Sequence, residues 1–327
     1  MNCLYCGKMI TDASSDEEKK DRWHIKCIRS FWGTKAMPVP DISEGQLEQL
    51  ANAAVNQGFT VTGVQKKLSL RLSCDADARL TIVDYPTGYI LKPQTQEYDS
   101  LPEFEDLAMR LAEIAGIKTV PHAMISMSGE YAYITKRIDR DIRDDVVSLY
   151  AMEDFCQLSE RSTQDKYKGS YENCGRVIRR FSIRPGLDLS ELFLRVVFSF
   201  IIGNSDMHLK NFSLRETEPA SRKYCLSGAY DMLPVSIILP EDPKQVALTL
   251  NGKKRNIRRK DFVKFAENCG VNAKSADAMM KKLCSLRDDF LLQCDQSYLS
   301  ADLRQKMKDL ISERIEQIGA GVFYPRT

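Results

Sequence analysis

Three polar residues in the second half of the chain have the types and the spacing that phosphoryl transfer requires. Asp206 and Asn211 stand in D-x-x-x-x-N spacing within Gly-Asn-Ser-Asp-Met-His-Leu-Lys-Asn-Phe-Ser, and Asp231 follows in Ala-Tyr-Asp-Met-Leu-Pro. A carboxylate in the first position can orient a hydroxyl and accept its proton, while the amide and the second carboxylate offer oxygen ligands to a metal. Because such a reaction leaves little covalent chemistry to the protein, positioned charge does most of the catalysis.

The same spacing also has a purely structural explanation, because Asp and Asn cap helices and stabilise turns. The surrounding pattern indicates where the residues stand. An apolar run over residues 192–202 ends at Gly203, and a second apolar pattern begins at Phe212. We therefore expect a buried helix that begins near residues 190–191, a tight polar loop that carries Asp206, and a short strand.

The whole string over residues 203–213 resembles the G-N-x-D-x-H-x-K-N-x-S signature of the HipA-like serine/threonine kinases, the toxins of certain bacterial toxin–antitoxin systems. The resemblance covers about residues 60–320. It implies an α+β, two-lobed, protein-kinase-like fold with a mainly helical C-terminal lobe, and transfer of the γ-phosphate of ATP to a protein Ser or Thr. It further implies that Asp206 is catalytic, that Asn211 and Asp231 bind magnesium, and that His208 lines the nucleotide pocket.

A lysine and a glutamate fit a second part of the kinase machinery. A strand over residues 89–91 delivers Lys92 before Pro93, which matches the family's I-x-K-P and implies contact with the α and β phosphates. In the helix expected over residues 102–115, Glu105 has the phase of the family's E-x-x-x-M-x-L-A and would hold Lys92, with Glu103 as the competitor. A strand-end lysine and solvated helix glutamates are the alternative explanation.

The segment before the first expected strand resembles the family's loop over the nucleotide phosphates. Alternating leucines predict the strand over residues 68–72. The G-x-Q-x-K pattern that precedes it would by itself indicate only a turn. The family resemblance assigns nucleotide binding there to Gly63, Val64, Gln65 and Lys67.

Two threonines, Thr60 and Thr62, stand just before that loop. In the HipA-like family, hydroxyl residues of this loop can be autophosphorylated, which disturbs the nucleotide site. The Thr-Val-Thr order matches the Ser-x-Ser arrangement of the shorter, HipT-type members. The alternative is that both are β-branched residues of an ordinary strand.

Two further residues are implied to contact the nucleotide. Residues 134–140 resemble the family's E-R-F-D-R hinge and place Arg137 there, although Lys136 and Ile138 depart from its Glu and Phe. Gln157 is the last residue of a segment that matches E-D-x-C-Q. The departures put side-chain contacts to adenine in doubt rather than nucleotide binding itself.

The N-terminal segment carries a C-x-x-C pair followed by an H-x-x-C pair, which suits tetrahedral zinc. The four ligands would be Cys3, Cys6, His24 and Cys27. Gly7 permits the turn after the second cysteine, and the use of all four positions makes the site structural rather than catalytic. The alternative is a metal-free segment that docks on the rest of the protein through Trp23 and Phe31.

Composition limits the remaining possibilities. The 327 residues include 43% hydrophobic residues, and 47 basic against 45 acidic residues give a net charge of +2. That length suffices for one large domain or two lobes, and the charge does not demand a nucleic-acid partner. We find no apolar stretch long enough for a membrane span and no signal peptide, so we expect a cytoplasmic protein without membrane contact.

The resemblance also predicts the division of the chain and its partners. We expect a zinc-knuckle segment over residues 1–33, a smaller sheet-containing lobe over residues 34–140 and a helical lobe over residues 141–327. From the resemblance we expect that the N-terminal subdomain of full-length HipA is missing, as in the HipT-type members. The implied partners are a HipB-like antitoxin, a small HipS-like protein, and an aminoacyl-tRNA synthetase as substrate.

A basic run over residues 253–260 invites a nucleic-acid interpretation. No aromatic residue interleaves it, and Asn251-Gly252 predicts a hairpin turn, so we favour a solvated hairpin arm. Two or three amphipathic helices should follow. Two other functions remain open: a pseudokinase-type binding protein and a small-molecule kinase of the same fold.

Overall fold

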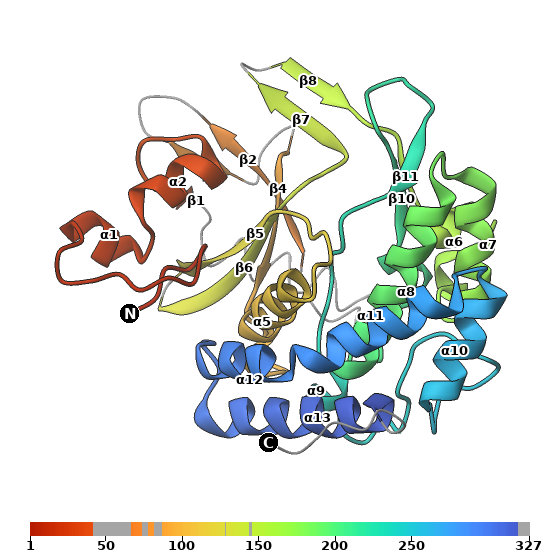
Figure 1. The fold of residues 1–327 in the computed structure, drawn as a ribbon. Helices are drawn as coiled ribbons and strands as arrows, with labels where there is room; N and C mark the ends of the chain where they lie inside the picture. Colours follow the sequence, from red (N-terminus) through yellow and green to blue (C-terminus); the bar gives the residue numbers. More distant parts are fainter. Residues whose placement is uncertain (42–66, 74–77, 82–86, 128, 144–145, 320–327) are drawn as a thin grey trace. The chain divides into compact units, whose positions relative to one another are not determined.

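The computed structural model describes residues 1–41, 67–73, 78–81, 87–127, 129–143 and 146–319 (Figure 1). The chain divides into two compact units. Unit 1 comprises Met1–Asp106 and Val120–Ser148, and unit 2 comprises Leu107–Thr119 and Leu149–Thr327. Unit 1 holds the largest described sheet and unit 2 most of the described helices, which confirms the expected α+β class. The domain boundaries at residues 33 and 140 stay predictions.

The described part of unit 1 contains a six-stranded sheet in the order β1-β3-β2-β4-β6-β5. Its strands are β1 (Val39–Asp41), β2 (Leu68–Ser73), β3 (Arg79–Thr81), β4 (Tyr89–Pro93), β5 (His122–Met127) and β6 (Glu130–Lys136). β1 and β3 are parallel, and the other neighbours are antiparallel. The strands expected over residues 68–72 and 89–91 are present as β2 and β4. In the β4–β6 register Lys92 lies opposite Tyr133, so the candidate catalytic lysine is near the end of a central strand.

Three further parts of the chain complete the described elements of unit 1. The N-terminal segment forms α1 (Asp16–Asp21) and α2 (Ile25–Trp32), and β7 (Arg140–Arg143) pairs with β8 (Val146–Leu149) in a separate ribbon. The first turns of α5 (Leu101–Ile114) belong to unit 1 and carry Glu105. Helix α5 therefore begins one residue before the helix expected over residues 102–115.

Unit 2 is built around α8 (Pro185–Ile201), which is apolar on nearly all sides and buried along most of its length. Phenylalanine rings of α8 pack against Phe262, Phe265 and Phe290 of the surrounding helices. The other helices are α6 (Phe155–Leu158), α7 (Tyr171–Phe181), α9 (Val235–Ile238), α10 (Arg259–Asn268), α11 (Ala273–Ser285), α12 (Arg287–Asp295) and α13 (Ala301–Gly319). The antiparallel strands β9 (Met152–Asp154), β10 (Ser213–Glu216) and β11 (Tyr224–Leu226) form the order β11-β10-β9.

The predicted start of the central helix near residues 190–191 is wrong. α8 begins at Pro185, a residue whose fixed φ and missing N–H suit the first helical position. Ser190 lies inside the helix and donates to the Gly186 carbonyl (3.0 Å) instead of capping. Glu191 accepts a hydrogen bond from the buried Arg195 (2.8 Å). Ser190 and Glu191, which the sequence analysis interpreted as a helix cap, therefore lie in the interior of α8.

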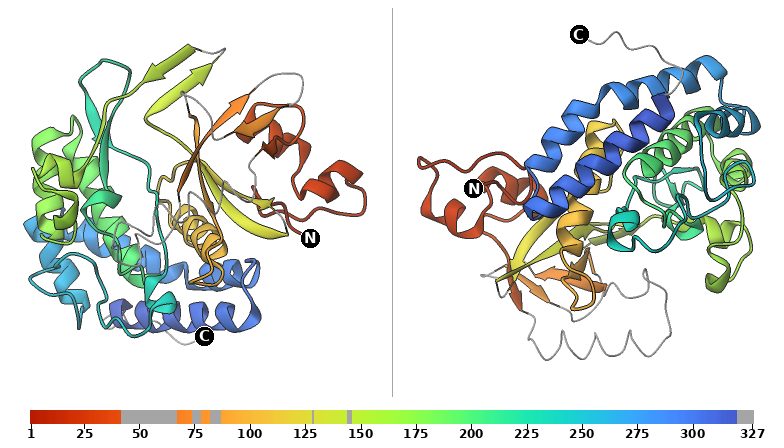
Figure 2. Two further views of the ribbon diagram at one scale, coloured as in Figure 1. Left: turned by 180° about the vertical axis from the view of Figure 1, so that it is seen from behind. Right: turned by 90° about the horizontal axis from the view of Figure 1, so that it is seen from below.

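The C-terminal part of the described chain contains α10, α11, α12 and α13, one helix more than the two or three expected. The extra boundary is a single residue, Leu286, which ends α11 and immediately precedes α12. No glycine or proline marks so short a break, so it is not visible in the sequence. α12 and α13 lie side by side in Figures 1 and 2. None of the described helices is long and apolar enough to cross a membrane.

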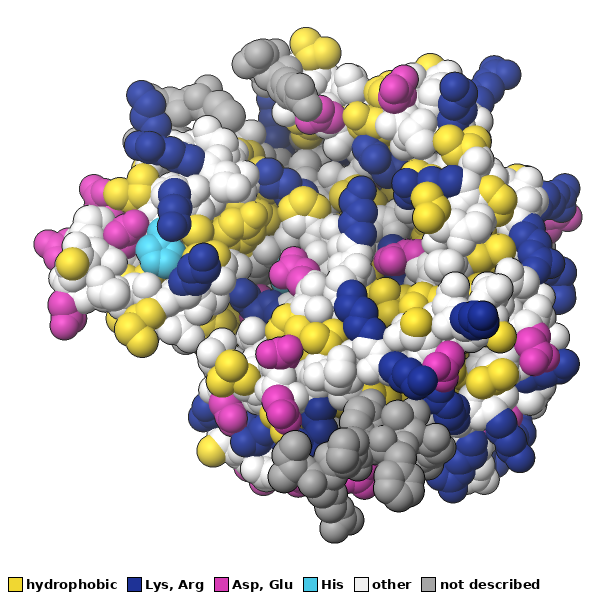
Figure 3. Space-filling model, in the orientation of Figure 1, with side chains coloured by type: hydrophobic (Ala, Val, Ile, Leu, Met, Phe, Trp, Pro, Cys, Tyr) yellow, Lys and Arg dark blue, Asp and Glu magenta, His cyan; other side chains and the backbone are white. Residues whose placement is uncertain are grey.

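The basic run is largely exposed, as expected of a solvated arm: Arg255, Arg258 and Lys260 are exposed, although Ile257 is buried. The Asn251-Gly252 turn is confirmed, since both residues have positive φ and Leu250 and Lys253 exchange backbone hydrogen bonds. Beyond it, Lys253 donates to the buried Asp261 (2.8 Å), which also accepts from the Arg258 amide (2.9 Å). The buried member of this contact is Asp261, whereas the Lys253 side chain keeps 41% exposure. On the face drawn in Figure 3, basic and acidic side chains are interspersed.

Candidate active site and metal centre

The catalytic-loop candidate begins at a position that requires glycine. Gly203 follows α8 with φ +72°, a conformation that L side chains rarely adopt. A Cβ there would lie 2.5 Å from Leu310 Cδ2 of α13 and 3.1 Å from Ser236 Cβ. The close approach and the positive φ together turn the chain sharply away from the helix axis.

The loop then holds Asp206 mainly through backbone atoms. The Asp206 amide donates to Asn204 Oδ1 (3.2 Å), and its carbonyl accepts from the His208 amide (2.7 Å) and from Asn211 Nδ2 (3.1 Å). Asp206, His208 and Asn211 are all buried. The D-x-x-x-x-N spacing therefore lets the Asn side chain close the loop on the Asp backbone, while the Asn amide oxygen suits a metal ligand.

The Asp206 carboxylate is oriented by an aromatic residue to which sequence reasoning gave no catalytic role. The Tyr167 hydroxyl donates to Asp206 Oδ1 (2.5 Å). His208 Nε2 lies 3.8 Å from Asp206 Oδ2, and its ring meets Tyr167 edge-on with 5.0 Å between centroids. Tyr167 is distant in the sequence and comes near only through the fold; the Leu209 amide donates to the neighbouring Lys166 carbonyl (3.2 Å).

The second metal-ligand candidate, Asp231, has φ +59°, in the left-handed region. The preceding Tyr230 donates to the Lys210 carbonyl (3.2 Å) and shares a hydrogen bond with the Ser213 hydroxyl. Burial raises the pKa of Tyr230, so the phenol stays protonated. Tyr230, the residue before Asp231, is thus hydrogen-bonded to one residue before Asn211 and to one residue after it. The amide and carboxylate oxygens of this set fit magnesium, which prefers oxygen ligands.

In unit 1, Lys92 Nζ donates to Glu105 Oε1, and both side chains are buried, with 4% and 0% exposure. The contact that the sequence assigned to Glu105 rather than Glu103 is therefore present, although its catalytic role stays a prediction. Lys92 Nζ also lies 5.4 Å from the Tyr133 ring centroid. His122 stacks on the same ring and lies near Asp106, residues that no sequence motif had indicated.

The expected phosphate loop is only partly visible. Lys67 is exposed immediately before β2. The other five predicted residues of this region lie outside the described residues: Thr60, Thr62, Gly63, Val64 and Gln65.

Arg137 and Gln157, the two remaining candidates for nucleotide binding, form hydrogen bonds with residues close to them in the sequence. Arg137 donates twice to Asp139, at 3.0 and 2.7 Å. Gln157 is exposed and forms a reciprocal capping box with Asp154 at the start of α6. These contacts explain the two residues structurally, and nucleotide binding by either stays a prediction.

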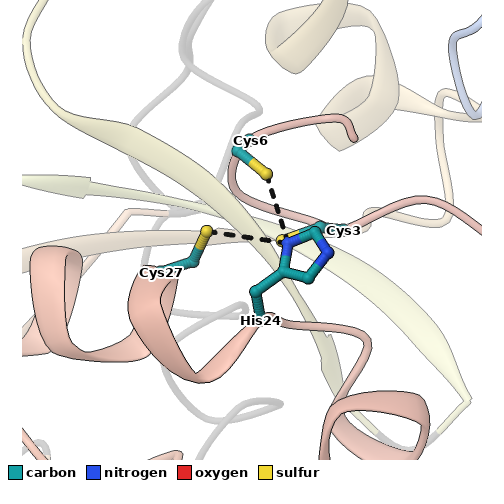
Figure 4. Close-up of side chains that lie close together, drawn as sticks. All are labelled: Cys3, Cys6, His24 and Cys27. Atoms are coloured by element: carbon teal, nitrogen blue, oxygen red, sulfur yellow. Dashed lines mark hydrogen bonds between the residues drawn. The ribbon is translucent and has the colours of Figure 1, made fainter. Parts of the chain in front are cut away.

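The four N-terminal metal-ligand candidates converge (Figure 4). The ligand atoms of Cys3, Cys6, His24 and Cys27 all lie within 4.8 Å of one another. His24 Nδ1 is 3.4 Å from Cys6 Sγ and 3.8 Å from Cys27 Sγ. Burial raises the pKa of Cys27. Burial also acts upward on Cys6, but hydrogen bonds from the Lys8 backbone and from its neighbouring side chains bring the pKa of Cys6 down to about 7.

The chain is similar in sequence to several known proteins. A putative kinase of Sinorhizobium fredii is 31% identical over 252 residues, which cover 72% of this chain and 59% of that protein. A second one from the same organism is 29% identical over 221 residues, covering 65% and 51%. A putative kinase of Haemophilus influenzae is 27% identical over 240 residues, covering 66% and 68%. The chain therefore spans about half to two thirds of the lengths of these relatives.

A solved structure and a family profile extend the comparison. The HipA chain of the Shewanella oneidensis HipA, HipB and operator DNA complex is similar, with a TM-score of 0.66 and 16% identity, covering 96% of this chain and 74% of that one. The profile of the HipA-like C-terminal domain matches residues 59–289, which include the whole candidate catalytic loop and Lys92. The chain belongs to the HipA-like C-terminal domain family.

Proposed function

We propose that the chain is an ATP-dependent protein serine/threonine kinase. The observation that carries the proposal is the buried Lys92–Glu105 pair. Burying two charges costs desolvation that their attraction often fails to recover, so a buried ion pair is weak evidence for a stabilising role. A lysine held in this way on a strand is the group that kinases use to position nucleotide phosphates.

The catalytic loop of unit 2 supplies the complementary chemistry. With Oδ1 of Asp206 held by Tyr167, Oδ2 is the oxygen that would accept the proton of the substrate hydroxyl. That hydroxyl oxygen bonds to the γ-phosphorus as the bond to the β–γ bridging oxygen breaks. Asn211 and Asp231 would hold magnesium, which neutralises charge on the phosphates.

The substrate and partner assignments extend the family resemblance. We propose an aminoacyl-tRNA synthetase as substrate, together with a HipB-like antitoxin and a small HipS-like protein as partners. The similar HipA was solved with HipB and operator DNA, which supports the assignment of a HipB-like antitoxin as a partner. For this chain we propose protein partners rather than direct contact with nucleic acid.

Labelled ATP distinguishes the candidate activities. The full-length chain is incubated with ATP that carries label in the γ-phosphate, magnesium and a bacterial extract. The label is then traced to protein and small-molecule fractions, with phosphosites identified by mass spectrometry. Phosphoserine or phosphothreonine supports the proposal. Label only in small molecules would instead identify a small-molecule kinase, and ATP binding without transfer would identify a pseudokinase.

Control by autophosphorylation at Thr60 or Thr62 is a further part of the proposal. A phosphate adds about −1.5 to −2 charge, which would oppose the nucleotide phosphates or capture Lys67 or Lys92. We expect the double variant Thr60→Ala, Thr62→Ala to stay active during long exposure to ATP, while the wild type loses activity and gains mass. If the active wild type gains no phosphate on the peptide holding these threonines, this mode of control is ruled out.

A further inference from the structure

We propose that Cys3, Cys6, His24 and Cys27 bind one structural zinc ion, and that this ion fastens the N-terminal segment to the sheet that carries Lys92. Zinc binding does not depend on the proposed kinase activity. The argument rests on the separations of the ligand atoms, on the contacts that orient them, and on the position of each ligand beside a residue that touches the sheet.

The separations fit one tetrahedral ion. With ordinary Zn–S and Zn–N bonds, a tetrahedral site places sulfur and nitrogen ligands about 3.6 Å apart and two sulfurs about 3.8 Å apart. His24 Nδ1 lies 3.4 Å from Cys6 Sγ and 3.8 Å from Cys27 Sγ, and all four ligand atoms fall within 4.8 Å of one another. The two separations from His24 thus match a tetrahedral zinc site, and all four ligand atoms are close enough together to share one ion.

The histidine has the contact expected of a metal ligand. Its Nε2 lies 3.3 Å from the Met9 carbonyl, so the Nε2–H form donates to that oxygen and leaves the Nδ1 lone pair directed at the sulfurs. His24 occupies the N-cap position of α2 but makes no side-chain capping bond. The side chain is therefore positioned for the cluster rather than for the helix end.

The cysteine pair has the backbone geometry of a zinc knuckle. Gly7 has φ +70°, and its amide donates to the Cys3 carbonyl (2.9 Å), which closes a tight turn. The Cys3 amide in turn donates to the Lys8 carbonyl (2.9 Å). Three cysteines that merely fill apolar space would not need this turn.

Residues beside the ligands dock the segment onto the sheet. Leu4 follows Cys3, and its carbonyl accepts from the Met124 amide (3.1 Å) on the edge strand β5. Trp23 precedes His24 and donates from Nε1 to the Met124 carbonyl (3.2 Å). Both backbone groups of Met124 are thereby satisfied, and the segment covers an edge that would otherwise be open to pairing.

Helix α2 makes the second contact with the sheet. Phe31 and Trp32 follow Cys27 in this helix, and their rings lie 6.0 and 4.9 Å from the Tyr89 ring centroid. Tyr89 begins β4, the strand that carries Lys92. One ion that joins the knuckle to α2 therefore holds together the contacts with β5 and β4. Loss of the ion should loosen both strands.

Metal analysis tests the first half of the proposal. The untagged full-length chain is prepared without chelators, beside Cys6→Ser and a control, Cys225→Ser, which changes a half-buried cysteine of β11. We expect about one zinc per chain in the wild type and the control, and a loss of most of it in Cys6→Ser. A wild type without zinc that also fails to take up added zinc would overturn the proposal. So would a Cys6→Ser variant that keeps the full complement.

Two measurements on the wild type guard against misfolding of the variant. Replacement of zinc by cobalt should give the visible and thiolate charge-transfer bands of a tetrahedral sulfur site, and an octahedral spectrum would contradict the ligand set. Hydrogen exchange before and after removal of the metal tests the fastening role. Peptides that cover β4 and β5 should exchange at least several-fold faster without zinc, while those of α8 stay unchanged. Unaltered exchange in both strands would refute that role.

Discussion

Unit 1 and unit 2 hold their candidate catalytic residues by different means. In unit 1, Lys92 on a strand meets Glu105 on a helix, side chain to side chain. In unit 2, the loop fixes the backbone of Asp206 through the side chains of Asn204 and Asn211. A side-chain pair depends on two complementary charges, whereas a backbone-held loop depends on its shape. The two units should therefore respond to different kinds of substitution.

The largest effect is expected in the charge pair. Lys92→Met should lower phosphoryl transfer by about a hundredfold or more, because the phosphates lose their positioned cation. It should also cost about 3–5 kcal/mol of unfolding free energy, because Glu105 is left as a buried, uncompensated charge. Kinetics and denaturant unfolding measure the two losses separately.

A double variant separates charge balance from catalysis. Lys92→Met with Glu105→Leu removes both charges and should recover most of the stability but none of the transfer. Lys306→Met, at an exposed site on α13, serves as the control and should change neither. If the double variant recovered transfer together with stability, the pair would be structural and the comparison between the units would fail.

The next largest effect is expected at the start of the loop. Gly203→Ala should cost about 2–4 kcal/mol, because its Cβ meets Leu310 in a backbone conformation that alanine disfavours. Gly186→Ala is the matched control, since it lies in α8 with nothing within 4 Å, and there alanine should be neutral or stabilising. Equal stability of the two variants in thermal unfolding would show that the loop tolerates a change of shape.

The smallest effect is expected at Asp139, whose contribution to the stability of unit 1 should depend on pH. A pH-dependent contribution distinguishes charge pairing in unit 1 from the steric cost expected in unit 2. Burial acts to raise the pKa of Asp139, but hydrogen bonds from Arg137 and Arg140 outweigh it and lower that pKa from 3.8 to about 2. A depressed pKa gives stability that is complete above about pH 4 and is lost as the pH falls toward 2. Asp139→Asn should therefore destabilise unit 1 by about 1 kcal/mol at neutral pH.

The pH series itself provides the check. Unfolding free energies of the wild type and Asp139→Asn should differ at pH 7 and approach each other between pH 4 and pH 2. A difference that stayed constant across this range would mean that the carboxylate charge contributes nothing. Gly203→Ala should show no such convergence over the same range, because its cost is steric.

Local patterns in the sequence predicted the elements better than their ends and contacts. Alternating leucines located β2, and the polar string after α8 located the candidate catalytic loop. The start of α8 was misplaced because Ser190, a common cap, bonds inside the helix, while Pro185 marked the true beginning. The break at Leu286 was missed because no glycine or proline marks it in the sequence.

Contacts between distant segments were the least predictable. Tyr167 reaches Asp206 across a large sequence separation, and Tyr133 reaches Lys92 only through the register of β4 and β6. Neither residue belongs to a periodic pattern that points to the partner. The convergence of the four N-terminal metal-ligand candidates could be predicted, because metal geometry constrains the spacing within each pair.

The most direct test compares Asp206, the candidate catalytic residue, with Asp288, an exposed aspartate outside the candidate site. Asp206→Asn keeps the shape of the side chain but removes its ability to accept a proton, whereas Asp288→Asn changes a residue that is 94% exposed. We expect Asp206→Asn to bind magnesium-ATP within a few-fold of the wild type and to transfer phosphate about a thousandfold more slowly, with Asp288→Asn unaffected in both. Undiminished transfer by Asp206→Asn would contradict the account.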